Sequence, residues 1–176
     1  MYIPIISLFI GMCLNMLTVS NVRKRAELLL TNPYVPLPDI IHNNVPKIPI
    51  FIPDYFLWLC GGVFFYNYNS LLHVEKNVLC LGLCTIIRSF SVFLTVLPSC
   101  MSKPDDKIES IYRKLFVSTH DLMFSGHSLF FISIGNMLNN DFIKITGPLL
   151  LVIARYHYTI DVCVSGLVYF FVYNNI

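Results

Sequence analysis

The sequence predicts an all-α, multi-pass integral membrane protein with six transmembrane helices. Hydrophobic residues make up 56% of its 176 residues and charged residues only 12%, about half the charged fraction of an ordinary soluble domain. The apolar residues gather into six stretches separated by polar connections. Because backbone polar groups must be satisfied inside lipid, each stretch is expected to be a helix. The length suits one membrane domain covering residues 1–176.

Six apolar stretches are the candidate spans: residues 2–19, 50–68, 78–97, 122–138, 145–156 and 160–173. The last two are short for a bilayer, which needs about 20 helical residues. Five prolines exclude a regular helix from the polar connection over residues 20–49. Six crossings put both chain ends on one side of the membrane. The connections after the first, third and fifth spans then share the opposite side.

Positive charge is concentrated on that opposite side. The net charge of +2 is too small to indicate a nucleic-acid partner. Nine of the 12 lysines and arginines fall in the three connections there: Arg23, Lys24, Arg25, Lys47, Lys103, Lys107, Arg113, Lys114 and Arg155. The positive-inside rule would make this side cytosolic.

Two ionisable residues flank the start of the last span. His157 and Asp161 are four residues apart, a spacing that puts both on one helix face. The carboxylate can then hold one imidazole nitrogen and leave the other nitrogen as a nucleophile or base. Ionisable groups at membrane depth are costly, which makes them candidates for function.

His127 is predicted to join this pair. The 29 residues between His127 and His157 must cross the membrane and return, so both imidazoles belong to one membrane face. One histidine can attack phosphorus while the other protonates the leaving oxygen. Each group could instead be a structural polar residue that bonds between helices, and spacing alone leaves the two interpretations nearly even.

Four segments in order resemble the motifs of the sphingomyelin synthase family, within the lipid phosphatase and phosphotransferase superfamily. They are Pro36-Leu-Pro-Asp39, Arg88-Ser-Phe-Ser-Val-Phe-Leu-Thr-Val-Leu-Pro98, Asp121-Leu-Met-Phe-Ser-Gly-His-Ser128 and His157-Tyr-Thr-Ile-Asp-Val162. Each motif alone is a weak signal. Their order and their places among the six spans make the resemblance specific, and it covers most of the chain.

The resemblance implies a ceramide phosphotransferase that needs no metal or other cofactor. A phosphocholine-like head group would pass from a glycerophospholipid to ceramide, releasing diacylglycerol. His157 would be the nucleophile, Asp161 its orienting carboxylate, and His127 the general acid and then base. Arg88 could steady the phosphate charge from the third span, or serve only to pair with a carboxylate inside the membrane.

Two further residues are candidates for substrate binding. Asp121 could counter a choline ammonium, or it could cap the helix that follows. Tyr158 lies between the catalytic candidates and could line the pocket. His120 stands where the family has a small residue, which puts head-group choice in doubt. The two other histidines, His42 and His73, are interpreted as surface residues.

Other functions are open for the same residues. A lipid phosphate phosphatase or a phospholipase C-like hydrolase would use this site with water as acceptor, and an inactive membrane protein could bind lipid or a partner. The family acts on the lumenal or outer face of Golgi-like or plasma membranes. We follow that expectation for the catalytic face, against the positive-inside rule. The predicted partners are membrane lipids.

Overall fold

The fold is all-α, as predicted. The structure is a computed structural model that describes residues 2–33, 35–67, 73–100 and 122–176, and within these ranges every regular element is a helix. The helices are α1 (Tyr2–Leu29), α2 (Ile40–Asn44), α3 (Phe51–Tyr66), α4 (Val74–Leu94), α6 (Gly126–Met137), α7 (Asp141–Ile153) and α8 (Thr159–Asn175).

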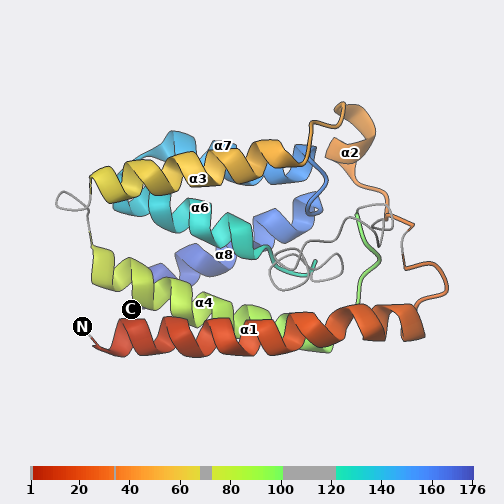
Figure 1. Cartoon of the computed structure of the whole chain (residues 1–176), viewed down its shortest axis with the longest axis horizontal. Helices are drawn as coiled ribbons and strands as arrows, with labels where there is room; N and C mark the ends of the chain where they lie inside the picture. The colour runs from red at the N-terminus through yellow and green to blue at the C-terminus, as the bar shows by residue number, and fades with distance from the viewer. Residues whose placement is uncertain (1, 34, 68–72, 101–121) are drawn as a thin grey trace.

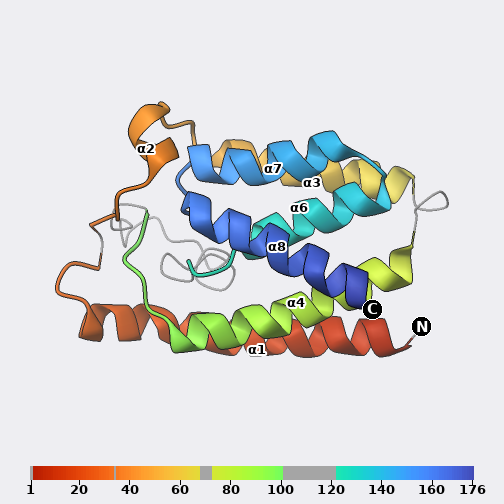
Figure 2. The ribbon, with the colours of Figure 1, turned by 180° about the vertical axis from the view of Figure 1, so that it is seen from behind.

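Six of these helices form an elongated bundle whose members alternate in direction along the chain (Figure 1). α1 lies along α4, α3 lies along α7, and α6 and α8 run between these two pairs. Both termini lie at one end of the bundle, and the view from behind shows the same arrangement (Figure 2). Short α2 and the starts of α3, α6 and α8 lie at the other end. The two termini therefore lie at the same end of the bundle, as the sequence predicts.

The first helix is longer than its apolar stretch. The prediction that a polar connection begins at residue 20 is wrong, because α1 continues to Leu29. Val19, Val22 and Ala26 are all buried, and their spacing of three and four residues puts them on one helix face. This buried stripe carries the helix through the basic run. The prolines that follow do lie outside a long helix, although the single turn and a half of α2 forms among them.

The starts of α6 and α7 are set by side-chain caps. The predicted span over residues 122–138 becomes helical only at Gly126, because Ser125 is extended and its hydroxyl accepts from the backbone N–H of Ser128. α7 begins at Asp141, four residues before the predicted start, because Asn140 caps it in the same way by accepting from Ile143. Polar N-cap residues satisfy helix N–H groups that have no partner within the helix.

The exterior of the bundle is apolar and its interior holds many polar groups. The exposed large side chains include Ile3, Ile6, Phe9, Trp58, Leu59, Phe90, Phe93, Ile145, Leu167 and Phe171. The buried polar side chains include Asn77, Arg88, Ser89, Ser128, Ser133, Asp161 and Ser165. Soluble proteins rarely expose apolar surface on this scale. α1 and α4 are also long and apolar enough to cross a membrane. Both observations indicate membrane association.

Two glycines bring α1 and α4 into backbone contact. A Cβ on Gly82 of α4 would lie 2.6 Å from the backbone nitrogen of Leu8 and 2.5 Å from the hydroxyl oxygen of Ser7. A Cβ on Gly11 of α1 would lie 2.9 Å from the carbonyl oxygen of Gly82. Small residues at a crossing let helix backbones approach closely, which is how helices associate in lipid.

Replacing Gly82 by alanine should therefore separate α1 from α4. We expect a destabilisation of about 1–3 kcal/mol, the usual cost of overpacking, seen as a lower melting temperature of the purified protein in detergent. Gly62→Ala in α3 is the matched control, because a Cβ there meets nothing within 4 Å. An equal melting temperature for Gly82→Ala and Gly62→Ala would show that the close contact does not exist.

Candidate active site

The two predicted catalytic histidines meet at the end of the bundle opposite the termini. His127 is the second residue of α6, and His157 lies in the connection between α7 and α8. Their ring centroids are 6.4 Å apart. His157 is 4% exposed, whereas His127 is half-buried. The predicted proximity is thus confirmed, while the catalytic roles stay a prediction.

His157 faces Asp161, as predicted, but the two residues do not lie on one helix. The sequence spacing suggested two residues on one helix face, whereas α8 begins only at Thr159 and His157 precedes it. The Nδ1 atom of His157 lies 3.5 Å from Oδ2 of Asp161. The same carboxylate oxygen accepts a hydrogen bond from the backbone N–H of Tyr158 at 3.0 Å. Asp161 therefore caps α8, and its carboxylate also faces Nδ1 of the imidazole.

The starts of α6 and α8 are fastened to each other. The hydroxyl of Ser165 donates to the carbonyl oxygens of Asp161 at 2.7 Å and Ser125 at 3.1 Å. The backbone N–H of Ser125 in turn lies 3.4 Å from the carbonyl oxygen of Asp161. Because Ser125 is two residues before His127, these bonds fix one histidine relative to the carboxylate that faces the other.

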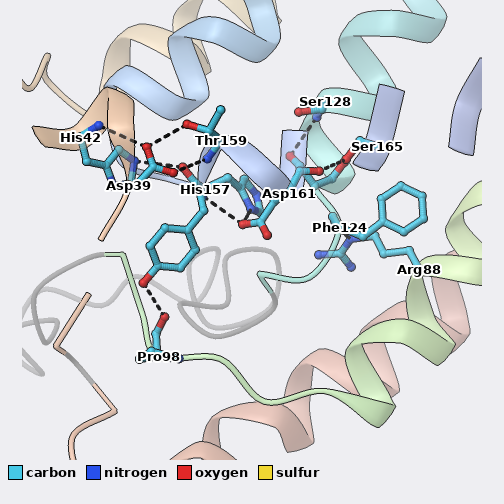
Figure 3. A network of polar contacts seen from close by, with 12 residues as sticks. Asp39, His42, Arg88, Pro98, Phe124, Ser128, His157, Thr159, Asp161 and Ser165 are labelled. Atoms are coloured by element: carbon cyan, nitrogen blue, oxygen red, sulfur yellow. Dashed lines mark hydrogen bonds and ion pairs between the residues drawn. The ribbon is translucent and has the colours of Figure 1, made fainter. Parts of the chain in front are cut away.

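Asp39, the last residue of the first motif, joins the N-termini of two helices (Figure 3). Its Oδ1 accepts from the backbone N–H groups of Ile41 and His42 at the start of α2 and from the hydroxyl of Thr159. Its Oδ2 accepts from the backbone N–H of Thr159 at 2.7 Å. Burial would raise the pKa of Asp39, but these hydrogen bonds outweigh it and hold the pKa below its ordinary value of 3.8.

Asp39→Asn should destabilise the protein by about 1–3 kcal/mol, because an amide nitrogen would face N–H donors that both carboxylate oxygens now accept from. The pH dependence has a definite sign. A lowered folded pKa gives stability that is present above 3.8 and is lost as the pH falls through the folded value. The melting temperatures of wild type and Asp39→Asn should therefore differ at pH 7 and converge below pH 3.8. A difference that persists unchanged into strong acid would contradict this.

His42 is not the surface residue that the sequence suggested. It is 8% exposed, and its Nε2 lies 3.2 Å from the carbonyl oxygen of His157. The guanidinium of Arg155 donates to the carbonyl oxygen of His42 at 2.9 Å. The short helix α2 is therefore tied to the connection that carries His157. His73, by contrast, is exposed as expected.

Tyr158 was expected to line the pocket, but its side chain is buried and bonds two connections to each other. It is 3% exposed, and its hydroxyl donates to the carbonyl oxygen of Pro98 and accepts from the backbone N–H of Leu37. Burial raises the pKa of the phenol. The ring packs with Cys100 and Leu122.

Arg88 points into the bundle and not at its exterior. It is 3% exposed, and its Nε donates to the carbonyl oxygen of Phe124 at 2.7 Å, just before α6. A second nitrogen of the guanidinium donates to the side chain of Asn15 on α1. The arginine thus joins α1 and α4 to the start of the helix that carries His127. The predicted alternative, that Arg88 pairs with a buried carboxylate, stays a prediction.

The sequence analysis did not single out two residues that lie beside His127, Tyr156 and Asp54. Tyr156 lies against His127 with ring centroids 5.9 Å apart, and its hydroxyl donates to Oδ2 of Asp54 at 2.9 Å. Asp54 is in the first turn of α3. The signal available in the sequence was an aspartate at the edge of an apolar stretch, on the side where the two histidines were expected.

Two hollows accompany this end of the bundle. One, of about 430 Å³, is lined by residues at the start of α3 that include Lys47, Phe51 and Asp54. The other, of about 570 Å³, is an apolar groove along α7 and α8, with Thr159 at the site and Lys144 at the far end. Neither is lined by the two catalytic candidates or by Asp161.

Asp121 lies outside the described residues, so its predicted role has no structural account. Within the described ranges, no group of three or more histidine, cysteine or acidic side chains is placed to hold a metal ion. No protein-family model matches the chain, and no curated protein matches it significantly.

Proposed function

We propose that the protein is a membrane-embedded lipid phosphotransferase that moves a phosphorylated head group from a glycerophospholipid to ceramide. The observation that carries the proposal is the grouping of His127, His157 and Asp161: two imidazoles 6.4 Å apart, with a carboxylate 3.5 Å from one of them. The four sequence motifs that resemble the sphingomyelin synthase family support the choice of substrates.

The first half-reaction forms a covalent intermediate. Asp161 holds the Nδ1 proton of His157, so that the Nε2 lone pair attacks the phosphorus of the donor lipid. The new N–P bond replaces the P–O bond to diacylglycerol. His127 gives its proton to the departing oxygen, which leaves as diacylglycerol. Arg88, whose guanidinium lies beside the start of α6, is proposed to stabilise the phosphate charge.

The second half-reaction reverses these roles. His127, now neutral, takes the proton of the ceramide hydroxyl, whose oxygen attacks the phosphorus. The P–O bond to ceramide forms as the N–P bond to His157 breaks, and both histidines return to their starting states. Splitting one difficult displacement into two easier ones is the general benefit of a covalent nucleophile.

The proposal includes six membrane crossings, with the site at one membrane face. The alternating directions of the six bundle helices and the apolar exterior support it. α6 and α7 have 12 and 13 residues, or about 18–20 Å of helix, against a hydrocarbon core of about 30 Å. We therefore expect the membrane to be thin around these helices. By resemblance, the face is the lumenal or outer one.

One experiment tests the proposed reaction. Membranes containing the protein are incubated with labelled ceramide and a mixture of phospholipids, every labelled product is identified, and diacylglycerol is measured separately. We expect ceramide carrying a phosphorylated head group, together with diacylglycerol, in equal amounts. Diacylglycerol without labelled product would instead identify a hydrolase that uses water as acceptor, and no turnover of any lipid would contradict enzyme function.

A further inference from the structure

The hollow at the start of α3 has the composition of a site for a zwitterionic head group. It has a volume of about 430 Å³ and is lined by residues at the start of α3, which lies at the same end of the bundle as the start of α8 (Figure 1). Its lining includes an ammonium from Lys47, a carboxylate from Asp54 and the aromatic ring of Phe51. Phe51 and Asp54 are three residues apart in α3, so they share one helix face.

These three groups suit the two ends of one ligand. A carboxylate and an aromatic face together attract an ammonium group, and quaternary ammonium ligands in particular are recognised by aromatic rings. A lysine is a point charge suited to a phosphate oxygen. Phe51 is 57% exposed, so its ring is accessible to a ligand.

The hollow is connected to the reacting groups through one side chain. The hydroxyl of Tyr156 donates to Asp54 at 2.9 Å, and the ring of Tyr156 lies 5.9 Å from the ring of His127. One phenol ring therefore separates the carboxylate from the proposed general acid. A head group that contacts Asp54 with its amine can extend past Tyr156 and place its phosphate between Lys47 and His127.

We propose that this hollow is the head-group subsite, which takes a phosphorylated amino alcohol of the choline or ethanolamine kind through Asp54, Phe51 and Lys47. The proposal rests on the proposed function for its substrate class. It assigns selection for a cationic amine to Asp54 on α3, outside the four motifs that resemble a known family.

The test measures binding without turnover. The full chain carrying His157→Ala is placed in detergent micelles with equal amounts of phosphatidylcholine and phosphatidylglycerol of identical acyl chains, and bound lipid is counted by native mass spectrometry. Phosphatidylcholine should be preferred, and adding Asp54→Asn should reduce that preference about tenfold, as expected for a lost contact to a charged group. Lys47→Gln should weaken the binding of both lipids and leave the ratio of bound phosphatidylcholine to bound phosphatidylglycerol unchanged.

Two further variants keep the test specific. Asp141→Asn is the matched control, since Asp141 also lies in the first turn of a helix and near a lysine, Lys144, but at the other end of the bundle. It should leave the preference unchanged. Tyr156→Phe removes the bond to Asp54 and keeps the carboxylate, so it too should preserve the preference. Loss of preference in either variant, or none in Asp54→Asn, would overturn the proposal.

The outcome is separable from that of the proposed function. A protein that prefers phosphatidylcholine through Asp54 but transfers no head group would uphold the subsite and contradict the reaction. A protein that makes labelled ceramide product while showing no Asp54-dependent preference would uphold the reaction and overturn the subsite.

Discussion

Replacing His157 by alanine is expected to abolish head-group transfer, to below about one thousandth of the wild-type rate, because the covalent nucleophile is lost. The change should leave the fold in place. The backbone carbonyl of His157 still accepts from His42, and Asp161 still caps α8 through Tyr158. The measurement is the initial rate of transfer at equal amounts of folded protein, judged by melting temperature.

Asp161→Asn is the companion variant. The amide oxygen can still accept from Tyr158, so the start of α8 should persist, but the negative charge that fixes the tautomer of His157 is gone. A loss of roughly 10²- to 10⁴-fold is expected, in line with removing the orienting carboxylate from other histidine sites. A His157→Ala protein that keeps a tenth of the wild-type rate at an unchanged melting temperature would refute the assignment of the nucleophile.

The second large effect concerns His127, whose proton is needed most when the leaving group is poor. His127→Ala should slow transfer from a natural phospholipid by about 10²- to 10⁴-fold, the usual contribution of general acid–base catalysis. A donor with an activated aryl leaving group departs without a proton. It should therefore restore the first half-reaction in His127→Ala but not in His157→Ala.

That asymmetry separates two histidines that look alike in the sequence. The rate to measure is release of the aryl alcohol in a single turnover, so that the second half-reaction does not limit it. The same activated donor should then restore aryl alcohol release in His127→Ala and fail to restore it in His157→Ala. Rescue of both variants, or of neither, would mean that the two roles are wrongly assigned.

The fold was predictable from the sequence where apolar stretches decide it. The positions of six helices follow from hydrophobicity, and the end of the bundle at which His127 and His157 meet follows from the alternating directions of those helices. The helix ends were not predictable in this way. α1 passes through Arg23, Lys24 and Arg25 because its buried stripe continues. The start of α6 is set by the Ser125 cap.

The surroundings of the site depend on contacts between residues distant in the sequence. Asp39 is 120 residues from Thr159, yet one carboxylate serves the starts of α2 and α8. His42 was interpreted as a surface histidine because the sequence does not show that its ring contacts the carbonyl oxygen of His157. Arg88 was expected as an ionisable group inside a span, but only the packing of α1 on α4 pairs it with Asn15. Such pairings are fixed by tertiary geometry, which no local pattern encodes.

The measurement closest to the central claim is direct detection of the covalent intermediate. Purified protein is incubated with phosphatidylcholine without ceramide, quenched in alkali to preserve the N–P bond, and analysed by peptide mass spectrometry. The account predicts a phosphocholine adduct on His157 that disappears when ceramide is added and is absent from His157→Ala. An adduct on another residue, or transfer to ceramide with no adduct on His157 at any time, would contradict it.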